Sequence, residues 1–520
     1  MRSKNNLKSR NKKPILKKYS QFLIIAILAL GCNGKKEKQD TKDTPGLGER
    51  PNIVFFFVDD MGWQDTSVPF HTELTQLNTI YHTPNMEQLA NEGMKFTQAY
   101  ASAVCSPSRI SLMTGMNAAR HRVTNWTLFP NKATDSEHNK VVAPEWNVNG
   151  LSTQAGINKT VYAQTLPELL KTAGYKTIHV GKAHFGAKGT PGENPLNLGF
   201  DVNIAGHAAG GPGSYLGKYN FSGAWRNADR VWDVPGLEKY HGEDIFLTEA
   251  LTIEANKAID KAVAEKKPFY LYMSHYAIHA PWEEDDRYYQ KYIDAGLNEF
   301  DATYAAMIEG MDKSLGDIRA NLERLGVADN TIIVFMSDNG SPKQTAQNLP
   351  LRGHKLTPYE GGVRVPMLVK WPGVTQSASI NDQYLIIEDI FPTFLEMAKL
   401  SKEAERSVDG ISFKPLLTGE GDYPVDRPIY WHFPNTYDQP PYSAVRKGDW
   451  KLIYHHIDRK LELFNLKSDI GETTDLAQEN SEKKAELVHL LSNYLAMVKA
   501  QMPIDKSINK PVEYPNQIIK

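Results

Sequence analysis

The chain has 520 residues, a formal net charge of −2, and 41% hydrophobic and 23% charged residues. This length accommodates one large domain and a smaller one, and the composition is ordinary for a soluble globular protein. Because the chain has no excess of basic residues, it is a poor match for nucleic acid, and no nucleic-acid partner is expected.

Residues 1–31 have the charge pattern of an export signal. Eight Lys or Arg and no acidic residue precede an apolar run at 22–30. This pattern predicts a secretory signal peptide that is too short to remain as a membrane span. The segment 28–32, Leu-Ala-Leu-Gly-Cys, resembles a bacterial lipobox. We therefore expect lipidation of Cys32, with simple cleavage as the alternative. The predicted location is the periplasm, or the outer membrane or cell surface, of a bacterium, with a lipid anchor as the sole membrane attachment.

Residues 32–50 are charged and lack apolar periodicity, which predicts a flexible tether. Beyond it, unbroken apolar runs of strand length recur at 53–58, 177–180, 269–273 and 331–336. Helical patterns lie between these runs, and the strongest extends from Tyr304 to Leu325 and ends at Gly326. This alternation predicts an α/β domain at 51–415, with a large, mostly parallel sheet between helices.

The pattern changes in residues 416–520. A hairpin is expected at 445–454, a further strand at 461–464 and an amphipathic helix at 482–499. These elements predict a small C-terminal α+β domain with an antiparallel sheet. The segment 205–240 is rich in Gly, Tyr and Trp and has little periodicity, which is typical of a long surface insertion, and such insertions are often functional.

Polar side chains follow each of the four apolar runs. They are Asp59 and Asp60, Lys182 and His184, His275 and His279, and Asp338 and Asn339. An isolated Asp-Asp pair often only caps a helix. Four strand ends that all carry such groups instead predict one pocket, because ligands of open α/β sheets bind beyond the carboxyl ends of the strands.

A metal site is expected among these residues. Asp59, Asp60, Asp338 and Asn339 offer hard oxygen ligands, which favour one Ca²⁺ ion, with Mg²⁺ as the second choice, over zinc or copper. Three carboxylates at one site are costly unless a cation neutralises them. Lys355 lies on a glycine-punctuated loop and adds a positive charge there, unless it is simply solvated.

The segment 105–109, Cys-Ser-Pro-Ser-Arg, is followed by Leu-x-Thr-Gly at 112–115. A proline near the start of a helix places Cys105 at the helix N-terminus, where backbone N–H groups favour an anion. Taken alone, Cys105 can equally be a buried thiol that acts as a small hydrophobe. The whole motif, however, resembles the signature of the type I, formylglycine-dependent sulfatases.

Further blocks resemble the same family and stand in its order. They are Val-Asp-Asp-Met-Gly-Trp at 58–63, Gly-Lys-Ala-His-Phe-Gly at 181–186, His-Ala-Pro at 279–281, Ser-Asp-Asn-Gly at 337–340 and Glu-Gly-Gly-Val-Arg-Val-Pro at 360–366. The resemblance spans about 51–476 and implies an alkaline-phosphatase-like fold. Ala183 and His354 depart from the family pattern, in which Trp and Gly are common at these positions.

The resemblance implies a role for each site residue. A maturation enzyme would convert Cys105 to formylglycine, and a hydroxyl of its hydrate would join the four oxygen ligands on Ca²⁺ and attack sulfur. Arg109 would hold this hydrate.

The remaining roles concern the substrate. Lys182 and Lys355 would bind the sulfuryl oxygens, and His279 would protonate the leaving alcohol. His184 would take the proton that lets sulfate leave. His275 is a further candidate for substrate binding, with a purely structural histidine as the alternative.

We therefore expect an exported sulfatase that acts on sulfated poly- or oligosaccharides, of the algal type such as ulvan or carrageenan. Aromatic side chains stack on sugar rings, and the candidates are Trp225, Trp232, Trp282 and Trp431. One alternative is a phosphodiester or phosphonate monoester hydrolase of the same superfamily. Another is an inactive glycan-binding lipoprotein in which Cys105 stays unmodified.

Overall fold

The computed structural model describes residues 50–518, apart from 346–347 and 401–407. The expected signal peptide, nearly all of the tether, and Cys32 lie outside the described residues. Within the described part of the chain, no helix has both the length and the apolar character needed to cross a membrane.

The main sheet of the described residues has nine strands, in the order β11-β2-β10-β9-β1-β8-β6-β7, with β12 beside β2. They are β1 (Asn52–Val58), β2 (Met94–Tyr100), β6 (Lys176–Gly181), β7 (Val202–Ile204), β8 (Phe269–Ser274), β9 (Thr331–Ser337), β10 (Arg364–Lys370), β11 (Ser379–Asn381) and β12 (Leu385–Ile386). Only β10 runs antiparallel to its neighbours β9 and β2, and every other pair is parallel. The predicted mostly parallel sheet is confirmed.

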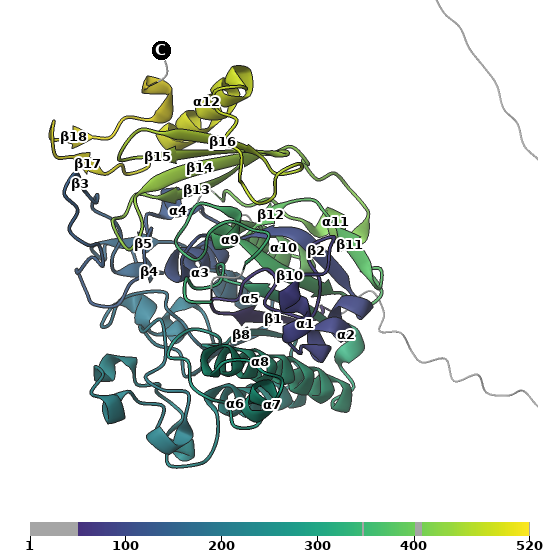
Figure 1. Ribbon diagram of the computed structural model, residues 1–520. Coiled ribbons are helices and arrows are strands. Elements are labelled where there is room, and N and C mark those ends of the chain that lie inside the picture. Colours follow the sequence, from purple (N-terminus) through teal and green to yellow (C-terminus); the bar gives the residue numbers. More distant parts are fainter. Residues whose placement is uncertain (1–49, 346–347, 401–407, 519–520) are drawn as a thin grey trace, which may run out of the picture. The chain divides into compact units, whose positions relative to one another are not determined.

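Helices cover both faces of this sheet (Figure 1). Every residue of β1 is buried, and because side chains alternate along a strand, its two faces belong to different cores. Phe55 and Phe57 lie in the core that includes helices α3 (Cys105–Thr114), α5 (Leu166–Thr172) and α10 (Ile390–Met397). Phe56 and Val58 lie in the core that includes α6 (Leu247–Ala264) and α8 (Glu299–Arg324). A strand buried on both faces explains the unbroken apolar run.

The helices have the following bounds: α1 (Gln76–Ile80), α2 (Pro84–Glu92), α3 (Cys105–Thr114), α4 (Ala118–His121), α5 (Leu166–Thr172), α6 (Leu247–Ala264), α7 (Tyr289–Asp294), α8 (Glu299–Arg324), α9 (Glu360–Val363), α10 (Ile390–Met397), α11 (Lys414–Thr418) and α12 (Ser481–Met497). The predicted helix that ends at Gly326 is α8, and Gly326 has the left-handed φ of 70° that a helix stop requires.

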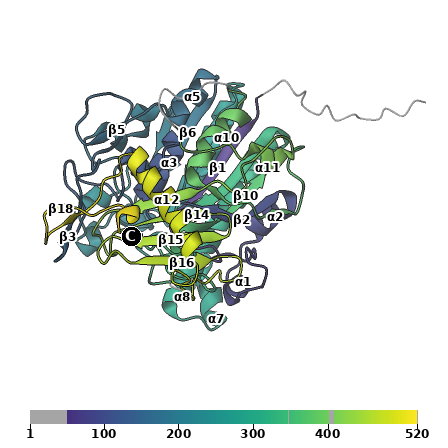
Figure 2. The same ribbon diagram turned by 90° about the horizontal axis from the view of Figure 1, so that it is seen from above.

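The C-terminal region forms a four-stranded antiparallel sheet, β13 (Ile429–Phe433), β14 (Tyr442–Lys447), β15 (Trp450–His455) and β16 (Leu461–Asn465). The predicted hairpin is β14–β15, and α12 lies across this sheet (Figure 2). The last strands, β17 (Ile504–Asp505) and β18 (Lys510–Pro511), pair with β3 (Val141–Val142). A separate short pair joins β4 (Gly150–Ser152) to β5 (Thr160–Tyr162). The predicted α+β architecture with an antiparallel sheet is confirmed, and the boundary at 415/416 stays a prediction.

The segment 205–240 has only short 3₁₀ turns. They are η3 (Gly217–Tyr219), η4 (Ala224–Arg226), η5 (Arg230–Trp232) and η6 (Glu238–Tyr240). Further 3₁₀ turns lie elsewhere, at η1 (Pro191–Glu193), η2 (Pro195–Leu198), η7 (Ala328–Asn330), η8 (Ile387–Asp389) and η9 (Pro515–Gln517). The segment nevertheless buries Tyr215, Phe221 and Leu237 in the core beside α6, so its base is anchored although its turns are irregular.

Candidate active site

The site is built on four strands that are neighbours in the sheet, in the order β9-β1-β8-β6. Asp338, Asp59 and Lys182 each lie in the loop directly after one of these strands. Backbone hydrogen bonds hold the loops together, with Asp338 N donating to Val58 O at 3.1 Å and Lys182 N donating to Ser274 O at 2.7 Å. The parallel topology therefore brings residues far apart in the chain to one edge of the sheet.

The oxygen ligands predicted from the sequence gather there. Carboxylate oxygens of Asp59, Asp60 and Asp338 and the Sγ atom of Cys105 all lie within 4.8 Å of one another. Asn339 donates from Nδ2 to Asp60 Oδ1 at 2.7 Å, and its buried Oδ1 has no hydrogen-bond partner among the described residues. A buried carbonyl oxygen left unpaired beside three carboxylates fits a hard divalent cation such as Ca²⁺.

Each carboxylate also has a basic partner from the chain itself. Lys182 donates to Asp59, Lys355 to Asp60, and Arg109 binds Asp338 Oδ2 through Nε at 3.0 Å and Nη2 at 2.7 Å. The expectation that a bound cation must neutralise the carboxylates is thus incomplete, because three side chains already share that task.

The surroundings shift the pKa values of Asp59 and Asp60 in opposite directions. Burial and the neighbouring Asp338 hold the pKa of Asp59 well above its usual range, although Lys182 opposes this shift. Burial also favours the neutral form of Asp60, but Lys355 and nearby basic groups lower the pKa of Asp60 below its usual value. Asp59 is therefore the carboxylate whose ionised form gains most from a further cation.

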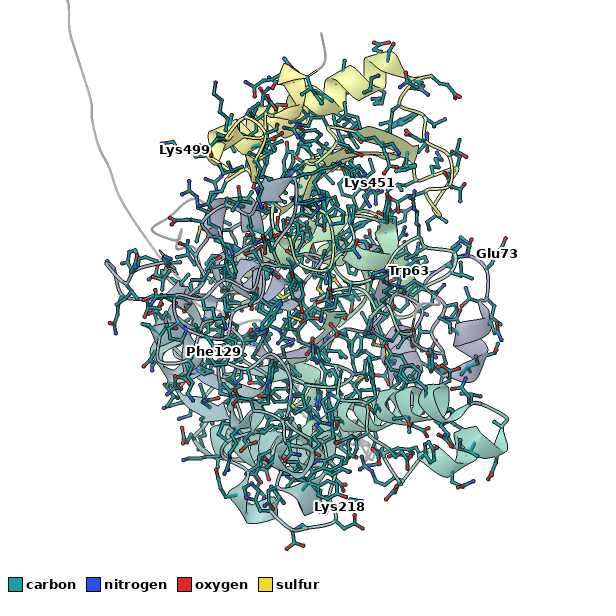
Figure 3. The ribbon with its side chains drawn as sticks, turned by 60° about the vertical axis from the view of Figure 1, so that its left-hand side comes forward. Trp63, Glu73, Phe129, Lys218, Lys451 and Lys499 are labelled. Carbon is teal, nitrogen blue, oxygen red and sulfur yellow. The ribbon has the colours of Figure 1, made fainter. Side chains whose placement is uncertain are left out.

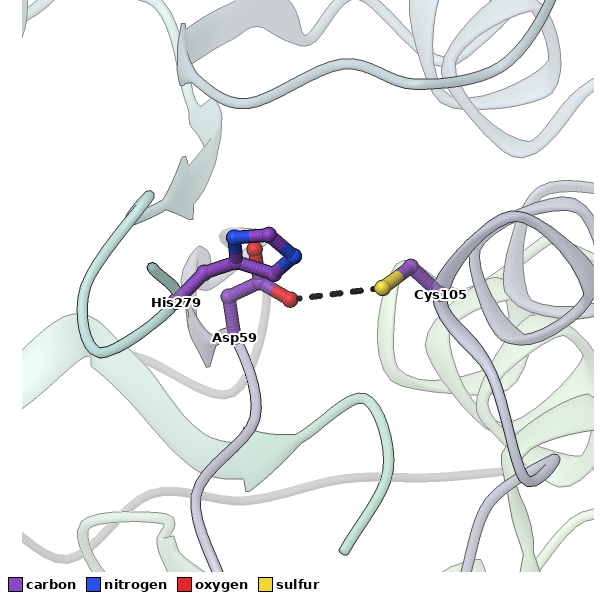
Figure 4. A group of neighbouring side chains, drawn as sticks. All are labelled: Asp59, Cys105 and His279. Carbon is purple, nitrogen blue, oxygen red and sulfur yellow. Dashed lines mark hydrogen bonds between the residues drawn. The ribbon is translucent and has the colours of Figure 1, made fainter. Parts of the chain in front are cut away.

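Cys105 is the first residue of α3, and Gly115 ends this helix with a left-handed φ of 69°. Its Sγ lies 3.5 Å from Asp59 Oδ1, the contact drawn in Figure 4, and 3.2 Å from Lys355 Nζ. Burial raises the pKa of the Cys105 thiol to about 12, although Lys182 and Lys355 oppose the shift. The unmodified side chain is consequently a protonated thiol and a poor nucleophile.

His184 is oriented as a base. Its Nε2 lies 3.0 Å from Thr127 O, and since a carbonyl only accepts, Nε2 carries the hydrogen and Nδ1 is left with a lone pair. Nδ1 is buried and has no partner in the described part of the chain. Burial, with Lys182 and Arg109, holds the pKa of His184 well below its usual value, so the ring is neutral. Gly210 lies against it, where a Cβ would come within 2.3 Å of Cε1.

His279 faces the carboxylates from the loop after β8. Its Nδ1 donates to Ala280 O at 2.7 Å, which leaves Nε2 3.7 Å from Asp60 Oδ2. Burial lowers the pKa of His279 to about 4, although Asp60 opposes this shift. In Figure 4 the ring lies beside Asp59, and ligand atoms of Asp59, Cys105 and His279 all lie within 4.8 Å of one another.

Six residues expected at the site are buried and do not line its cavity: Asp59, Arg109, Lys182, His275, Asp338 and Asn339. The His275 ring is buried against Phe56, with Nε2 2.9 Å from Ser314 Oγ of α8. This position matches the structural alternative for His275, because the ring lies in the core beneath the sheet edge. Arg109 is fully buried, and besides Asp338 it binds Ser274 Oγ at 2.5 Å and Lys182 O at 3.3 Å.

A cavity of about 620 Å³ opens above Cys105. It is lined by Asp60, Cys105, His184, His279, Lys355 and His354, by the aromatic residues Trp126, Trp232, Trp282 and Tyr437, and by Lys343, Gln344, Asp438 and Gln439, among others. Of the four tryptophans suggested by the sequence, Trp232 and Trp282 line it. Trp431 is buried, with Nε1 donating to Ala101 O, and Trp225 lies on the surface.

Sequence reasoning missed Trp126, Tyr437 and the contact of Gly210 with His184. The glycine-rich run at 210–213 was the available signal for that contact, because glycines permit close approach. No local pattern pointed to Tyr437, which reaches the cavity from the loop between β13 and β14 and packs edge-on against Trp126, with ring centroids 5.6 Å apart.

This site suits the cleavage of an anionic ester. Its basic side chains can meet the anion, and its two histidines can move protons on either side of the bond that breaks.

The family model for sulfatases matches residues 51–400, and the chain belongs to this family. A second model, for the C-terminal part of N-sulphoglucosamine sulphohydrolase, matches residues 354–501. The protein is therefore a sulfuric ester hydrolase.

Individual relatives support the same family assignment. A sulfatase from Formosa agariphila is 29% identical over 531 residues, covering 92% of this chain and 93% of that protein. Human N-acetylgalactosamine-6-sulfatase is 34% identical over 404 residues, covering 74% of this chain and 69% of its own. The crystal structure of Ps i-CgsB in complex with k-i-k-neocarrahexaose superposes with a TM-score of 0.70 at 26% identity, covering 90% of this chain and 96% of that one. The expected sulfatase fold is confirmed.

Proposed function

We propose that this sulfatase removes sulfate from sulfated poly- or oligosaccharides of the algal type, such as ulvan or carrageenan. The observation that carries this proposal is the cavity itself, because four aromatic side chains, Trp126, Trp232, Trp282 and Tyr437, surround the approach to Cys105. Aromatic side chains offer large, rigid faces with a polar edge, which suit sugar rings. The carrageenan-type oligosaccharide bound to Ps i-CgsB supports the same substrate class.

The proposed nucleophile is formylglycine, made from Cys105 by a maturation enzyme that oxidises the thiol. The sequence motif at 105–115 supports this modification, and the high pKa of the buried thiol makes the unmodified side chain a poor nucleophile. Asp59, Asp60, Asp338 and Asn339 would hold one Ca²⁺ ion, with Mg²⁺ as the second choice. When bound, the cation would polarise the oxygens at the reacting centre.

In the first step, one hydroxyl of the hydrated aldehyde at residue 105 forms a bond to sulfur, and the bond from sulfur to the sugar oxygen breaks. Asp59 Oδ1 is the nearest carboxylate oxygen to residue 105, at 3.5 Å, and takes the proton of the attacking hydroxyl. A cation at the site would hold Asp59 in the ionised form that this role requires, against the burial that raises its pKa. His279 gives a proton to the sugar oxygen as it leaves. The negative charge of the bound ester favours the protonated ring that this role requires.

In the second step, His184 takes the proton of the remaining hydroxyl at residue 105. The bond from that carbon to the sulfate oxygen then breaks, which releases sulfate and restores the aldehyde. The free lone pair on Nδ1 supports this role. Lys355, which lines the cavity, and Lys182, which is buried against Asp59, neutralise the sulfuryl oxygens in both steps. Arg109 acts as a positioning residue, because it holds Asp338.

We further propose export of the chain through residues 1–31 and lipidation of Cys32, on the sequence pattern alone. Mass measurement of the mature N-terminus in a bacterial host, with and without Cys32→Ala, tests this. A diacylated cysteine at the new N-terminus supports a lipoprotein, and a free N-terminus supports simple cleavage.

The catalytic proposal is tested on protein co-expressed with a formylglycine-generating enzyme. The peptide that contains residue 105 should carry the mass of formylglycine, and dialysis against a chelator should abolish turnover of a sulfated oligosaccharide. Ca²⁺ should restore turnover better than Zn²⁺ does. Full activity in a sample shown to be metal-free by elemental analysis contradicts the metal site.

The same preparation distinguishes the proposed sulfatase from the two alternative functions. A phosphodiester or phosphonate monoester hydrolase should prefer an aryl phosphodiester to the matched aryl sulfate. An inactive glycan-binding lipoprotein should retain an unmodified Cys105 and bind sulfated oligosaccharides without releasing sulfate.

A further inference from the structure

Two large aromatic side chains are exposed together on the segment 205–240. Tyr219 at the end of η3 stacks on Trp225 of η4, with ring centroids 4.7 Å apart and planes inclined by 21°. Trp225 remains 52% exposed and Tyr219 38% exposed. Exposing this much aromatic surface at one place is uncommon in a soluble protein and typically marks a binding surface.

Positive charge borders these rings. Lys218 Nζ lies 5.7 Å from the Tyr219 ring centroid, and Arg226 Cζ lies 5.7 Å from that of Trp225. We call these four residues, Lys218, Tyr219, Trp225 and Arg226, the Trp225 platform. The exposed Arg230 lies four residues further along and pairs with Asp233. The platform thus combines apolar faces with cations, which is the combination a sulfated sugar requires.

Hydrogen bonds and an ion pair connect the Trp225 platform to residues that line, or are adjacent to, the catalytic cavity. Arg226 Nη2 donates to Gly213 O at 2.6 Å, and Gly213 N donates in turn to O of Trp232, which lines the cavity. Arg226 Nη1 also lies 3.6 Å from Glu283, the neighbour of the cavity residue Trp282. Trp232 lies seven positions after Trp225 in the sequence, so their Cα atoms are at most about 25 Å apart. Figure 3 shows Lys218 at the outer edge of this region, well apart from Lys451.

We propose that the Trp225 platform is a second carbohydrate-binding site, which holds the chain of a sulfated polysaccharide while one of its sulfate groups occupies the catalytic cavity. This inference rests on the proposed function, because it assumes a polymeric or long oligomeric substrate. The rings stack on sugar units, Lys218 meets sulfate groups, and Arg226 anchors the platform through Gly213 and Glu283. The connection to Trp232 and Trp282 directs the chain toward Cys105. The platform raises affinity for long substrates and leaves the chemistry unchanged.

Binding is measured first, in a Cys105→Ala background that cannot turn over. Affinity electrophoresis uses gels that contain carrageenan, ulvan or dextran sulfate, each paired with a desulfated or unsulfated polymer of the same backbone. Trp225→Ala should weaken binding to at least one sulfated polymer about tenfold, as for a residue that dominates an interface. Trp225→Phe should retain most of the binding, and Lys218→Ala should weaken it chiefly at low salt.

Met497→Ala is the matched control, because Met497 is 62% exposed on α12 and belongs to a different region. It should leave the binding of every polymer unchanged. Melting temperatures of all variants should agree with that of the parent, because the substituted side chains are on the surface.

Turnover by the formylglycine-bearing enzyme then separates this inference from the proposed function. Trp225→Ala should raise KM about tenfold for a sulfated polymer and leave kcat, and both constants for a sulfated monosaccharide, unchanged. Equal losses on the short and long substrates, or unchanged binding of every polymer, would overturn the platform.

Two other outcomes are equally decisive. Loss of binding to vesicles of phosphatidylglycerol, with polymer binding unchanged, would assign the surface to anionic lipid and overturn the proposal. Failure of the wild-type enzyme to desulfate any carbohydrate would contradict the proposed function, whereas the binding measurement would still decide on the platform.

Discussion

Two clusters of buried charge in this molecule differ in what they leave unsatisfied. The first is the active site, in which Lys182, Lys355 and Arg109 pair with three carboxylates. The second joins the C-terminal sheet to α9, where Lys451 of β15 lies 2.9 Å from Glu360 and 3.0 Å from Glu472 (Figure 3).

In the second cluster the charges bind one another from several sides. Glu360 also accepts from Tyr100 at 2.5 Å, and Glu472 accepts from Glu360 N at 2.7 Å. In the first cluster, Asn339 Oδ1 and His184 Nδ1 have no partner among the described residues, and Cys105 borders a cavity. Buried polar atoms are normally paired, so unpaired ones beside open space indicate a site built for a ligand.

The largest expected effect is at Cys105. Cys105→Ala should abolish sulfate release, because it removes the side chain that lines the cavity 3.2 Å from Lys355 and 3.5 Å from Asp59. Sulfate release from a sulfated oligosaccharide measures this, and an unchanged melting temperature serves as the folding control. Retention of even one tenth of wild-type activity would show that residue 105 is not the nucleophile precursor.

His279→Ala should lower kcat/KM on a sulfated sugar by about 10²–10⁴-fold, the usual contribution of a general acid. The loss on an activated aryl sulfate should be far smaller, because its phenol leaves without protonation. Comparison of the two substrates in one preparation measures the difference. If both substrates lose activity equally, His279 binds sulfate instead, and the acid must be sought at Lys355.

Lys451→Met tests the second cluster of buried charge, which joins the C-terminal sheet to α9. Removing this lysine leaves the buried Glu472 without its basic partner, whereas Glu360 keeps Arg364 at 3.3 Å. A buried carboxylate without its partner should cost about 3–5 kcal/mol of unfolding free energy. Denaturant unfolding followed by fluorescence measures the loss, and kcat of the folded enzyme should stay near the wild-type value. Lys447→Met is the matched control on β14, because its half-exposed pair with Glu486 should contribute at most about 1 kcal/mol. Equal losses in the two variants would contradict the structural role of Lys451.

Gly210→Ala should lower kcat roughly 10- to 100-fold, because a Cβ would force the His184 ring out of place and small displacements of catalytic groups are costly. The substrate KM should change little. Gly210→Ala in a His184→Ala background provides the control, since no ring remains to be displaced and no further loss is expected. An additive loss in the double variant would mean that Gly210 acts through another contact.

The positions of the four central strands and the polar residues at their ends were readable in advance, because both depend on short-range patterns. The apolar run at 53–58 requires burial on both faces, and polar residues directly after such runs reach the same edge of a parallel sheet. The candidate metal ligands and both candidate catalytic histidines were predicted in this way, and the structure brings them together at one edge of the sheet. His275 follows its strand just as closely, yet its ring turns into the core toward Ser314. Residue spacing does not determine the direction of a side chain in a loop.

The sequence by itself therefore determined the fold class, the sulfatase motifs and the candidate chemistry, because periodicity and motif are local properties of the chain. Only the tertiary structure decided which basic group pairs with which carboxylate, which aromatic residues surround the cavity, and that Gly210 lies against His184. These contacts join residues that are tens to hundreds of positions apart, such as Lys355 with Asp60 and Tyr437 with Trp126. Such pairs depend on how whole strands and loops pack together, and no local pattern encodes that packing.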